Sequence, residues 1–174
     1  MKKCALVVGH KKASPGAMNK STGVTEFEFN DSLAIDIESV VSGVVVQRIY
    51  RRTYESLPSD INTYGPDFII SLHCNAYDGD ASGTEVLYYH RSTKGREMAA
   101  LLNQNLAAVL GLHDRGIKAR SVEDRGGHLL KYTHAPCVIA EPFFIDNDND
   151  FDTGNRNRDA LIEAYASSIM QLSE

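Results

Sequence analysis

The sequence predicts a single α/β domain built on a mixed, mostly parallel sheet. Several short apolar runs are continuous, which is typical of strands that are covered on both faces. These runs alternate with longer segments whose apolar residues recur at helical spacing, and such alternation is the pattern of α/β folds. The 174 residues, with 43% hydrophobic and 24% charged side chains, have the composition of one globular domain without repeats or linkers.

The first half of the chain alternates between expected strands and helices. Cys4 to Val8 is a short apolar run that Gly9 ends, so we expect a buried strand there. Thr25 is suited to cap an amphipathic helix that begins at Glu26 and ends near Gly43. The remaining elements expected in this half are a strand at 44–49, a short helix at 57–64 and a strand at 67–72.

The second half continues the same alternation. Polar and apolar residues alternate enough from Gly83 to Tyr89 to favour an exposed or edge strand. A helix is expected from Ser92 to Leu110, where Gly111 stops it. The later expected elements are a small strand at 117–120, a helical turn at 129–132, a buried strand at 136–141 and a closing helix at 158–172. The acidic run "DNDND" at 146–150 lacks the glycine and the glutamate of a calcium loop, so we interpret it as a solvated loop.

Charge and cysteine content exclude several classes of protein. The formal charge of −5 and the pI near 5.7 argue against a binder of nucleic acid or of anionic membranes. No apolar run approaches the length of a membrane span. The cysteines, Cys4, Cys74 and Cys137, are odd in number and lie in or beside apolar runs, which predicts buried, reduced thiols.

The amino-terminal segment does not resemble a secretion signal. "MKKCALVVGH" holds basic residues but too few apolar ones for the central region of a signal peptide. We therefore expect a chain that is cytoplasmic when synthesised. We also interpret Arg51 and Arg52 as a solvated pair, and His90, His113 and His134 as surface or loop residues.

Chemically capable side chains follow three of the expected strands. His10 lies just past the first strand, His73 just past "DFIISL", and Glu141 ends "PCVIA". Ligand sites of open α/β sheets lie beyond the carboxyl ends of the strands, and Glu26 at the start of the first helix is placed to reach the same edge. Taken alone, His73 is more readily interpreted as a satisfied core histidine than as a metal ligand, and Glu26 as an acid that favours a helix start.

Two imidazoles and one carboxylate form the ligand set of an open catalytic zinc site. His10, Glu26 and His73 meet that requirement, and Zn²⁺ makes water acidic enough to supply a hydroxide nucleophile at neutral pH. A second carboxylate outside the ligand set is then needed to move protons. Glu141 suits that role, because an unpaired acid at the end of an apolar strand is costly unless it has a function.

The motifs resemble those of the zinc-dependent N-acetylmuramoyl-L-alanine amidases of the Amidase_3 type, which occur in cell-wall enzymes and phage endolysins. The resemblance covers almost the whole chain and rests on segments in one fixed order. These segments are "GH" with "SPGA" at 9–17, "GVTEFEFN" at 23–30, "DFIISLHCNA" at 67–76, "GTEVLYY" at 83–89, "DRGIK" at 114–118 and "PCVIAEPFFIDN" at 136–147.

The resemblance implies Zn²⁺ bound by His10, Glu26 and His73, with Glu141 as catalytic acid and base. It implies a single α/β domain of about six strands, so we expect one catalytic domain over residues 1–174. Nothing in the sequence suggests a second domain, so we expect no separate cell-wall-binding domain. The implied reaction is hydrolysis of the amide that joins N-acetylmuramic acid to L-alanine in peptidoglycan. The residues expected to contact substrate are Asn75, Arg115 and His128.

Two details of the resemblance bear on specificity and on the ligand set. Family members often carry Gly two residues after the catalytic glutamate, where this chain has Phe143, so we expect a bulkier pocket wall. Glu26 is preferred over Glu28 because of its spacing to Asn30, and a helix beginning at Glu26 would turn Glu28 away from the metal.

The expected protein is a monomeric amidase whose partner is peptidoglycan, and a phage endolysin is a plausible source. Two alternatives stay open at this point. One is a zinc peptidase or carboxypeptidase that acts on wall peptides with the same metal site. The other is a non-catalytic peptidoglycan-binding module, which the presence of all four site residues disfavours.

Overall fold

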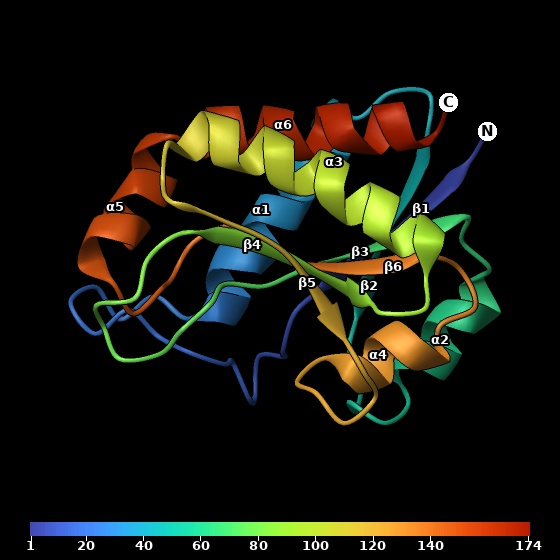
Figure 1. Ribbon diagram of the computed structural model, residues 1–174, viewed down its shortest axis with the longest axis horizontal. Coiled ribbons are helices and arrows are strands. Elements are labelled where there is room, and N and C mark those ends of the chain that lie inside the picture. The colour runs from blue at the N-terminus through green and yellow to red at the C-terminus, as the bar shows by residue number, and fades with distance from the viewer.

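A computed structural model describes residues 1–174 and shows one six-stranded sheet between helices (Figure 1). The strand order is β2-β1-β3-β6-β4-β5. The strands are β1 (Lys3–Val8), β2 (Val45–Tyr50), β3 (Phe68–Leu72), β4 (Thr84–Tyr89), β5 (Asp114–Arg120) and β6 (Cys137–Glu141). The helices are α1 (Glu26–Val40), α2 (Leu57–Tyr64), α3 (Thr93–Leu110), α4 (Gly127–Tyr132), α5 (Asp148–Arg156) and α6 (Arg158–Leu172). The predicted α/β class and mostly parallel sheet are confirmed.

The sheet changes direction only once. β2, β1, β3 and β6 are parallel to their neighbours, β4 pairs with β6 in the antiparallel sense, and β5 runs parallel to β4. The central strands β1, β3 and β6 are apolar on both faces because helices cover both. Their carboxyl ends therefore meet at one edge of the sheet.

The two faces of the sheet are filled unequally. On one face α1, α3 and α6 pack over the sheet, and the core there contains 27 buried residues (Figure 1). On the other face the short helices α2 and α4 enclose a smaller cluster of 10 residues. The shorter helices leave part of this second face uncovered near the carboxyl ends of the strands, which is where the groove described below opens.

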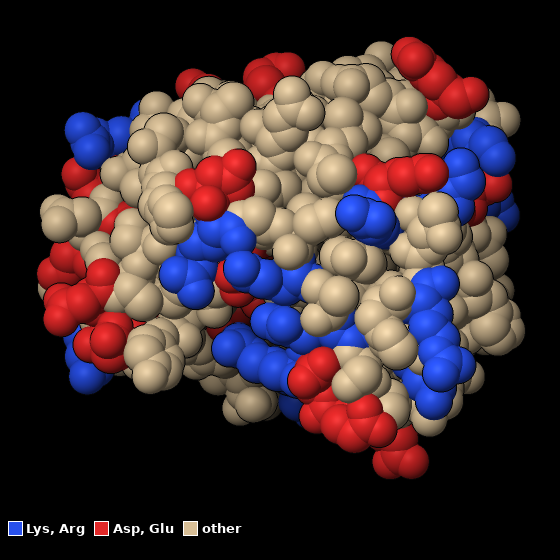
Figure 2. All heavy atoms as spheres, in the orientation of Figure 1, with Lys and Arg blue, Asp and Glu red and all other residues tan.

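The prediction that residues 83–89 form an exposed or edge strand is wrong. β4 lies inside the sheet between β6 and β5, and its polar Glu85 is buried because it pairs with Arg115 of β5. The edge position belongs to β5, which carries Arg115, Lys118 and Arg120. Figure 2 shows Lys and Arg side chains gathered in a band along this part of the surface. Charged side chains on an edge strand oppose pairing with other chains.

The interpretation of residues 146–150 as a solvated loop is also wrong. Asn147 caps α5 by accepting a hydrogen bond from the backbone N–H of Asp150, and acidic residues favour the first turn of a helix. The carboxylate of Asp150 is 1% exposed and accepts hydrogen bonds from the backbone N–H groups of Gly83 and Phe144 and from the Ser82 hydroxyl. Asp150 therefore ties α5 to the segment before β4.

The three cysteines are buried and unpaired, as the sequence predicts. No helix combines the length and the apolar character that crossing a bilayer requires.

Replacing the buried carboxylate should destabilise the protein. Asp150→Ala leaves buried backbone N–H donors without an acceptor, so we expect the free energy of unfolding to fall by about 3 kcal/mol. The control is Asp152→Ala in the same helix, since Asp152 is exposed and pairs only with Arg156. That control should cost less than about 0.5 kcal/mol in urea denaturation. Equal losses for the two variants would contradict the role given to Asp150.

Candidate metal and proton-transfer site

Three adjacent parallel strands bring the predicted side chains together. β1, β3 and β6 are neighbours in the sheet, and their registers align Val8 with Leu72 and Leu72 with Ala140. His10, His73 and Glu141 stand at or just beyond these aligned ends. The sequence argument that equivalent strand ends share one edge is therefore confirmed.

Tight backbone turns hold His10 against the sheet edge. His10 adopts φ +64°, an uncommon conformation for a residue other than glycine. Gly16 also has a positive φ, and a Cβ added there would lie 2.6 Å from Cδ2 of His10 and 2.7 Å from Oε2 of Glu26. The loop after β1 thus passes close over two candidate ligands, and only glycine fits at position 16 without displacing them.

The capping of α1 determines which glutamate faces the site. Thr25 accepts a hydrogen bond from the backbone N–H of Glu28, and the Glu28 carboxylate accepts one from the backbone N–H of Thr25. This capping box engages Glu28 at the surface. Glu26, in the first turn, points into the site and is 1% exposed.

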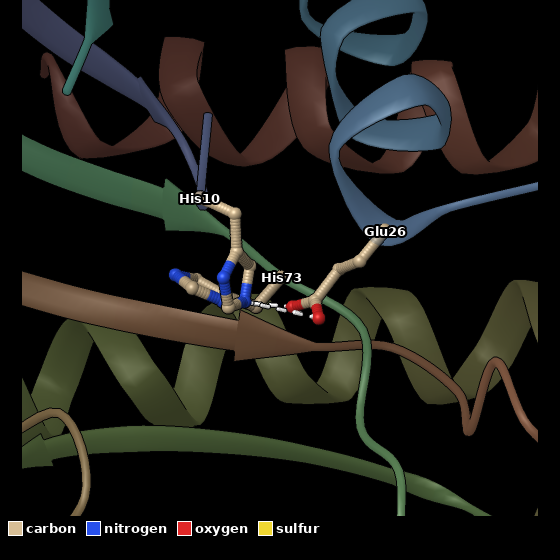
Figure 3. Close-up of side chains that lie close together, drawn as sticks. All are labelled: His10, Glu26 and His73. Atoms are coloured by element: carbon tan, nitrogen blue, oxygen red, sulfur yellow. Dashed lines mark hydrogen bonds and ion pairs between the residues drawn. The ribbon is translucent and has the colours of Figure 1, made fainter. Parts of the chain in front are cut away.

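The side chains of His10, Glu26 and His73 point toward one another (Figure 3). Oε2 of Glu26 lies 3.0 Å from Nε2 of His10, and Oε1 lies 2.9 Å from Nδ1 of His73. Backbone N–H groups of Ala17 and Cys74 each donate to one oxygen of the same carboxylate. The candidate ligand atoms all lie within 4.8 Å of one another.

This cluster fits a metal ion better than it fits an ordinary ion pair. Nε2 of His10 is buried and, although Oε2 of Glu26 lies 3.0 Å away, makes no hydrogen bond. Burial favours a raised pKa for Glu26, yet attraction from the two imidazoles holds that pKa well below its usual range. An ionised carboxylate and two imidazoles suit a divalent transition metal with an open coordination position.

Glu141 has the opposite electrostatic character. It is 3% exposed, and its Oε2 has no hydrogen-bond partner. Burial, with the negative charge of Glu26 as the next cause, raises the pKa of Glu141 to about 8. A carboxyl group with such a pKa can both accept and donate protons near neutral pH.

The site lies in a groove of about 370 Å³, a size typical of small-ligand sites. His10, His73 and Glu141 line it together with His128 of α4. The floor is apolar and comes from the strands, and the rim comes from the segment after β2 and from the loop before α4. The lining residues on this rim include Arg51, Tyr54, Val122, Glu123, Asp124 and Arg125.

The three predicted substrate-binding residues separate into two groups. His128 lines the groove, as expected. Asn75 and Arg115 lie outside the groove lining and instead meet at Glu85, where the Asn75 amide donates to Oε1 at 2.9 Å and Arg115 Nε donates to Oε2 at 3.0 Å. Because Glu85 is paired with Glu141 across the β4–β6 ladder, this cluster supports the strand that carries Glu141.

The expectation that Phe143 forms a bulkier pocket wall is wrong. Phe143 is fully buried, because its ring packs against Phe29 and Phe151 in the core beneath α1 and α5. The expected solvated pair of Arg51 and Arg52 is confirmed only for Arg52, which is exposed and pairs with Asp60, whereas Arg51 is half-buried and lines the groove.

Sequence reasoning missed Glu85 and the arginines of the groove. Glu85 lies in a strand whose polar and apolar residues alternate, and nothing in the sequence indicates that Arg115 is its partner. The rim depends on how loops fold back over the sheet, so no local signal identified Arg51 or Arg125.

An open α/β sheet with a three-ligand metal cluster and a buried proton-transfer carboxyl at its carboxyl edge defines a candidate metal-dependent hydrolase domain. Residues 4–171 match the N-acetylmuramoyl-L-alanine amidase family, Amidase_3. The chain belongs to this family.

Individual relatives agree with this membership. N-acetylmuramoyl-L-alanine amidase LytC of Bacillus subtilis (strain 168) is 27% identical over 151 residues, which cover 82% of this chain and 29% of LytC. The chain thus spans under a third of that relative's length. The catalytic domain of the CD27L endolysin, which targets Clostridia difficile, is 27% identical with a TM-score of 0.83, covering 98% of both chains. The catalytic domain of CwlV, an N-acetylmuramoyl-L-alanine amidase from Bacillus (Paenibacillus) polymyxa var. colistinus, shares the fold with a TM-score of 0.86 at 21% identity, covering 98% of this chain and 97% of its own.

Metal binding should depend on Glu26 and not on Glu28. We expect Glu26→Ala to abolish the visible absorption that Co²⁺ acquires when protein ligands hold it, because the variant lacks the only carboxylate of the cluster. Glu28→Ala is the matched control, since it loses a helix cap worth about 1 kcal/mol but no ligand. Retained absorption in Glu26→Ala would show that the cluster is assigned wrongly.

The stability of the metal-free protein should fall as the pH rises, and Glu141 should cause part of this fall. Its pKa in the folded protein is about 8, well above the roughly 4.3 expected when unfolded. The neutral form of Glu141 therefore makes its full contribution to the free energy of unfolding below about pH 4. This contribution is lost as the pH rises through about 8.

Glu141→Gln keeps the shape of the side chain but removes its ionisable carboxyl group. Below pH 4 we expect the variant and the wild type to be similarly stable. At pH 9 the variant should be more stable by several kcal/mol, because each unit of pKa shift corresponds to about 1.4 kcal/mol. Urea denaturation in the presence of a chelator measures the difference, and a difference that does not change with pH would contradict the raised pKa.

Proposed function

We propose that this chain hydrolyses the amide bond between N-acetylmuramic acid and the L-alanine of the peptidoglycan stem peptide, with Zn²⁺ held by His10, Glu26 and His73. The observation that carries the proposal is one groove lined by His10, His73 and the unpartnered carboxyl of Glu141, with Glu26 buried against the two histidines. The matching family and the names of the relatives support this substrate class.

The residues of the chain have two separate roles, which are to hold the metal ion and to transfer protons. When bound, Zn²⁺ would supply Lewis-acid activation of the amide carbonyl and of water. Glu26 is kept ionised by the two imidazoles and oriented by the N–H groups of Ala17 and Cys74, so it holds its ligand oxygens in place. Orientation of ligands by such secondary hydrogen bonds strengthens a metal site.

Glu141 performs the proton transfers. Glu141 lines the groove and its buried Oε2 has no partner, so this carboxyl can accept a proton from the attacking water. The same carboxyl then donates that proton to the amide nitrogen, because an amine leaves readily only when it is protonated. The surrounding apolar strand residues exclude water and keep the pKa of this carboxyl near neutrality.

The substrate enters along the groove rather than through a tunnel. The groove is open between the segment after β2 and the loop before α4, and the imidazole of His128 lies along it. An open groove suits a polymer whose glycan strand extends past the site on both sides. We therefore place the action of the protein on the cell wall.

The decisive test is digestion of purified peptidoglycan. We expect new L-alanine amino termini to appear, chelation to stop their release, and added Zn²⁺ to restore it. Glu141→Gln should bind one Zn²⁺ per chain but release termini at least about 100-fold more slowly, since it cannot transfer protons. Glu97→Gln is the control, because Glu97 is an exposed glutamate of α3 paired only with Lys94.

The products also separate this function from its closest alternatives. Cleavage within the stem peptide, without new L-alanine termini, would assign the site to a peptidase. A protein that binds Zn²⁺ but leaves the wall intact would assign the chain to a binding module.

A further inference from the structure

Two guanidinium groups line the groove without an acidic partner. Arg51 directly follows β2, and Arg125 lies in the loop before α4, so both stand on the rim above the carboxyl ends of the strands. Neither forms an ion pair or a hydrogen bond with an acidic side chain. Arg52, the neighbour of Arg51, instead binds both carboxylate oxygens of Asp60 and lies outside the groove.

The two cations line one groove together with Tyr54 and Glu141. Cζ of Arg51 lies 5.7 Å from the centre of the Tyr54 ring. Burial raises the pKa of the Tyr54 hydroxyl, and the positive charges of Arg51 and Arg125 both act against that rise. The positive charge of Arg125 likewise acts against the raised pKa of the Glu141 carboxyl.

The acidic residues of the same rim form no ion pair with these guanidinium groups. Glu123 and Asp124 belong to the loop that carries Arg125, but both side chains accept hydrogen bonds from Ser121 instead. The Ser121 hydroxyl donates to Glu123 at 2.8 Å, and the Ser121 backbone N–H donates to Asp124 at 2.7 Å. The N–H donors of the two guanidinium groups thus have no acidic partner and stay free to bind a ligand.

We propose that Arg51 and Arg125 form a carboxylate-binding subsite, which anchors an anionic peptide so that its scissile amide lies between the metal cluster and Glu141. A guanidinium group presents parallel N–H donors that match the two oxygens of a carboxylate. This inference rests on the proposed function and adds to it a preference for a stem peptide with a free carboxylate near the cleaved bond.

The experiment compares two synthetic muramoyl dipeptides that differ in a single group. Both carry L-alanine on the lactyl group, and the second residue ends in a free carboxylate in one and in a carboxamide in the other. The measured quantity is the ratio of kcat/KM for the carboxylate to kcat/KM for the carboxamide. Any change in Glu141 that follows from removing a nearby charge affects both substrates and cancels in this ratio.

We expect the wild-type protein to prefer the carboxylate substrate, and Arg125→Ala to lower the ratio about tenfold, mainly through KM. Arg51→Ala should lower it in the same direction. Arg125→Lys should retain part of the preference, since it keeps the charge but loses the paired donors. The control Arg52→Ala should leave the ratio unchanged, and thermal unfolding checks that each variant is folded.

The outcomes separate this inference from the function on which it rests. If the wild-type protein cleaves both substrates with the same ratio as Arg51→Ala and Arg125→Ala, the subsite is refuted while the amidase function stands. If the wild-type protein cleaves neither substrate nor purified peptidoglycan, the proposed function fails and the subsite fails with it.

Discussion

The site depends on the parallel alignment of β1, β3 and β6 in the middle of the sheet. Parallel neighbours place their carboxyl ends at one edge, and this register brings His10, His73 and Glu141 together from distant parts of the chain. The helices that bury these strands on both faces also fix α1, whose first turn supplies Glu26. The unequal covering of the two faces then leaves a groove beside these residues.

Two buried carboxyl groups in this small volume are held in opposite states. Glu26 receives two backbone N–H groups and faces two imidazoles, so its ionised form is favoured. Glu141 receives no hydrogen bond at Oε2 and feels the charge of Glu26, so its neutral form is favoured. Pairs of acids whose surroundings drive their pKa values apart are typical of acid–base catalysis. The charge of Glu26 thus helps to keep the Glu141 carboxyl suited to proton transfer.

The sequence predicted the parts of the site that depend on strand ends and helix caps. The choice of Glu26 over Glu28 rested on its spacing to Asn30, and helical geometry indicated that the two could not share one site. In the structure the capping box of Thr25 engages Glu28 elsewhere. The parts that it missed depend on contacts between distant segments. β4 is an internal strand because β5 pairs with it, and the acidic run forms a helix because Asp150 finds donors next to β4. Neither partner is visible in the local sequence.

Phe143 follows Glu141 by two residues but packs on the opposite face of the sheet from the groove. Its ring fills space between α1 and α5, and a Cβ added at Gly154 would lie 2.6 Å from that ring. The size of the side chain at either position therefore limits the size of the side chain at the other. A relative with glycine at the position of Phe143 is free to carry a larger residue at the position of Gly154, so we expect the two positions to vary together through evolution while the groove beside Glu141 keeps its shape.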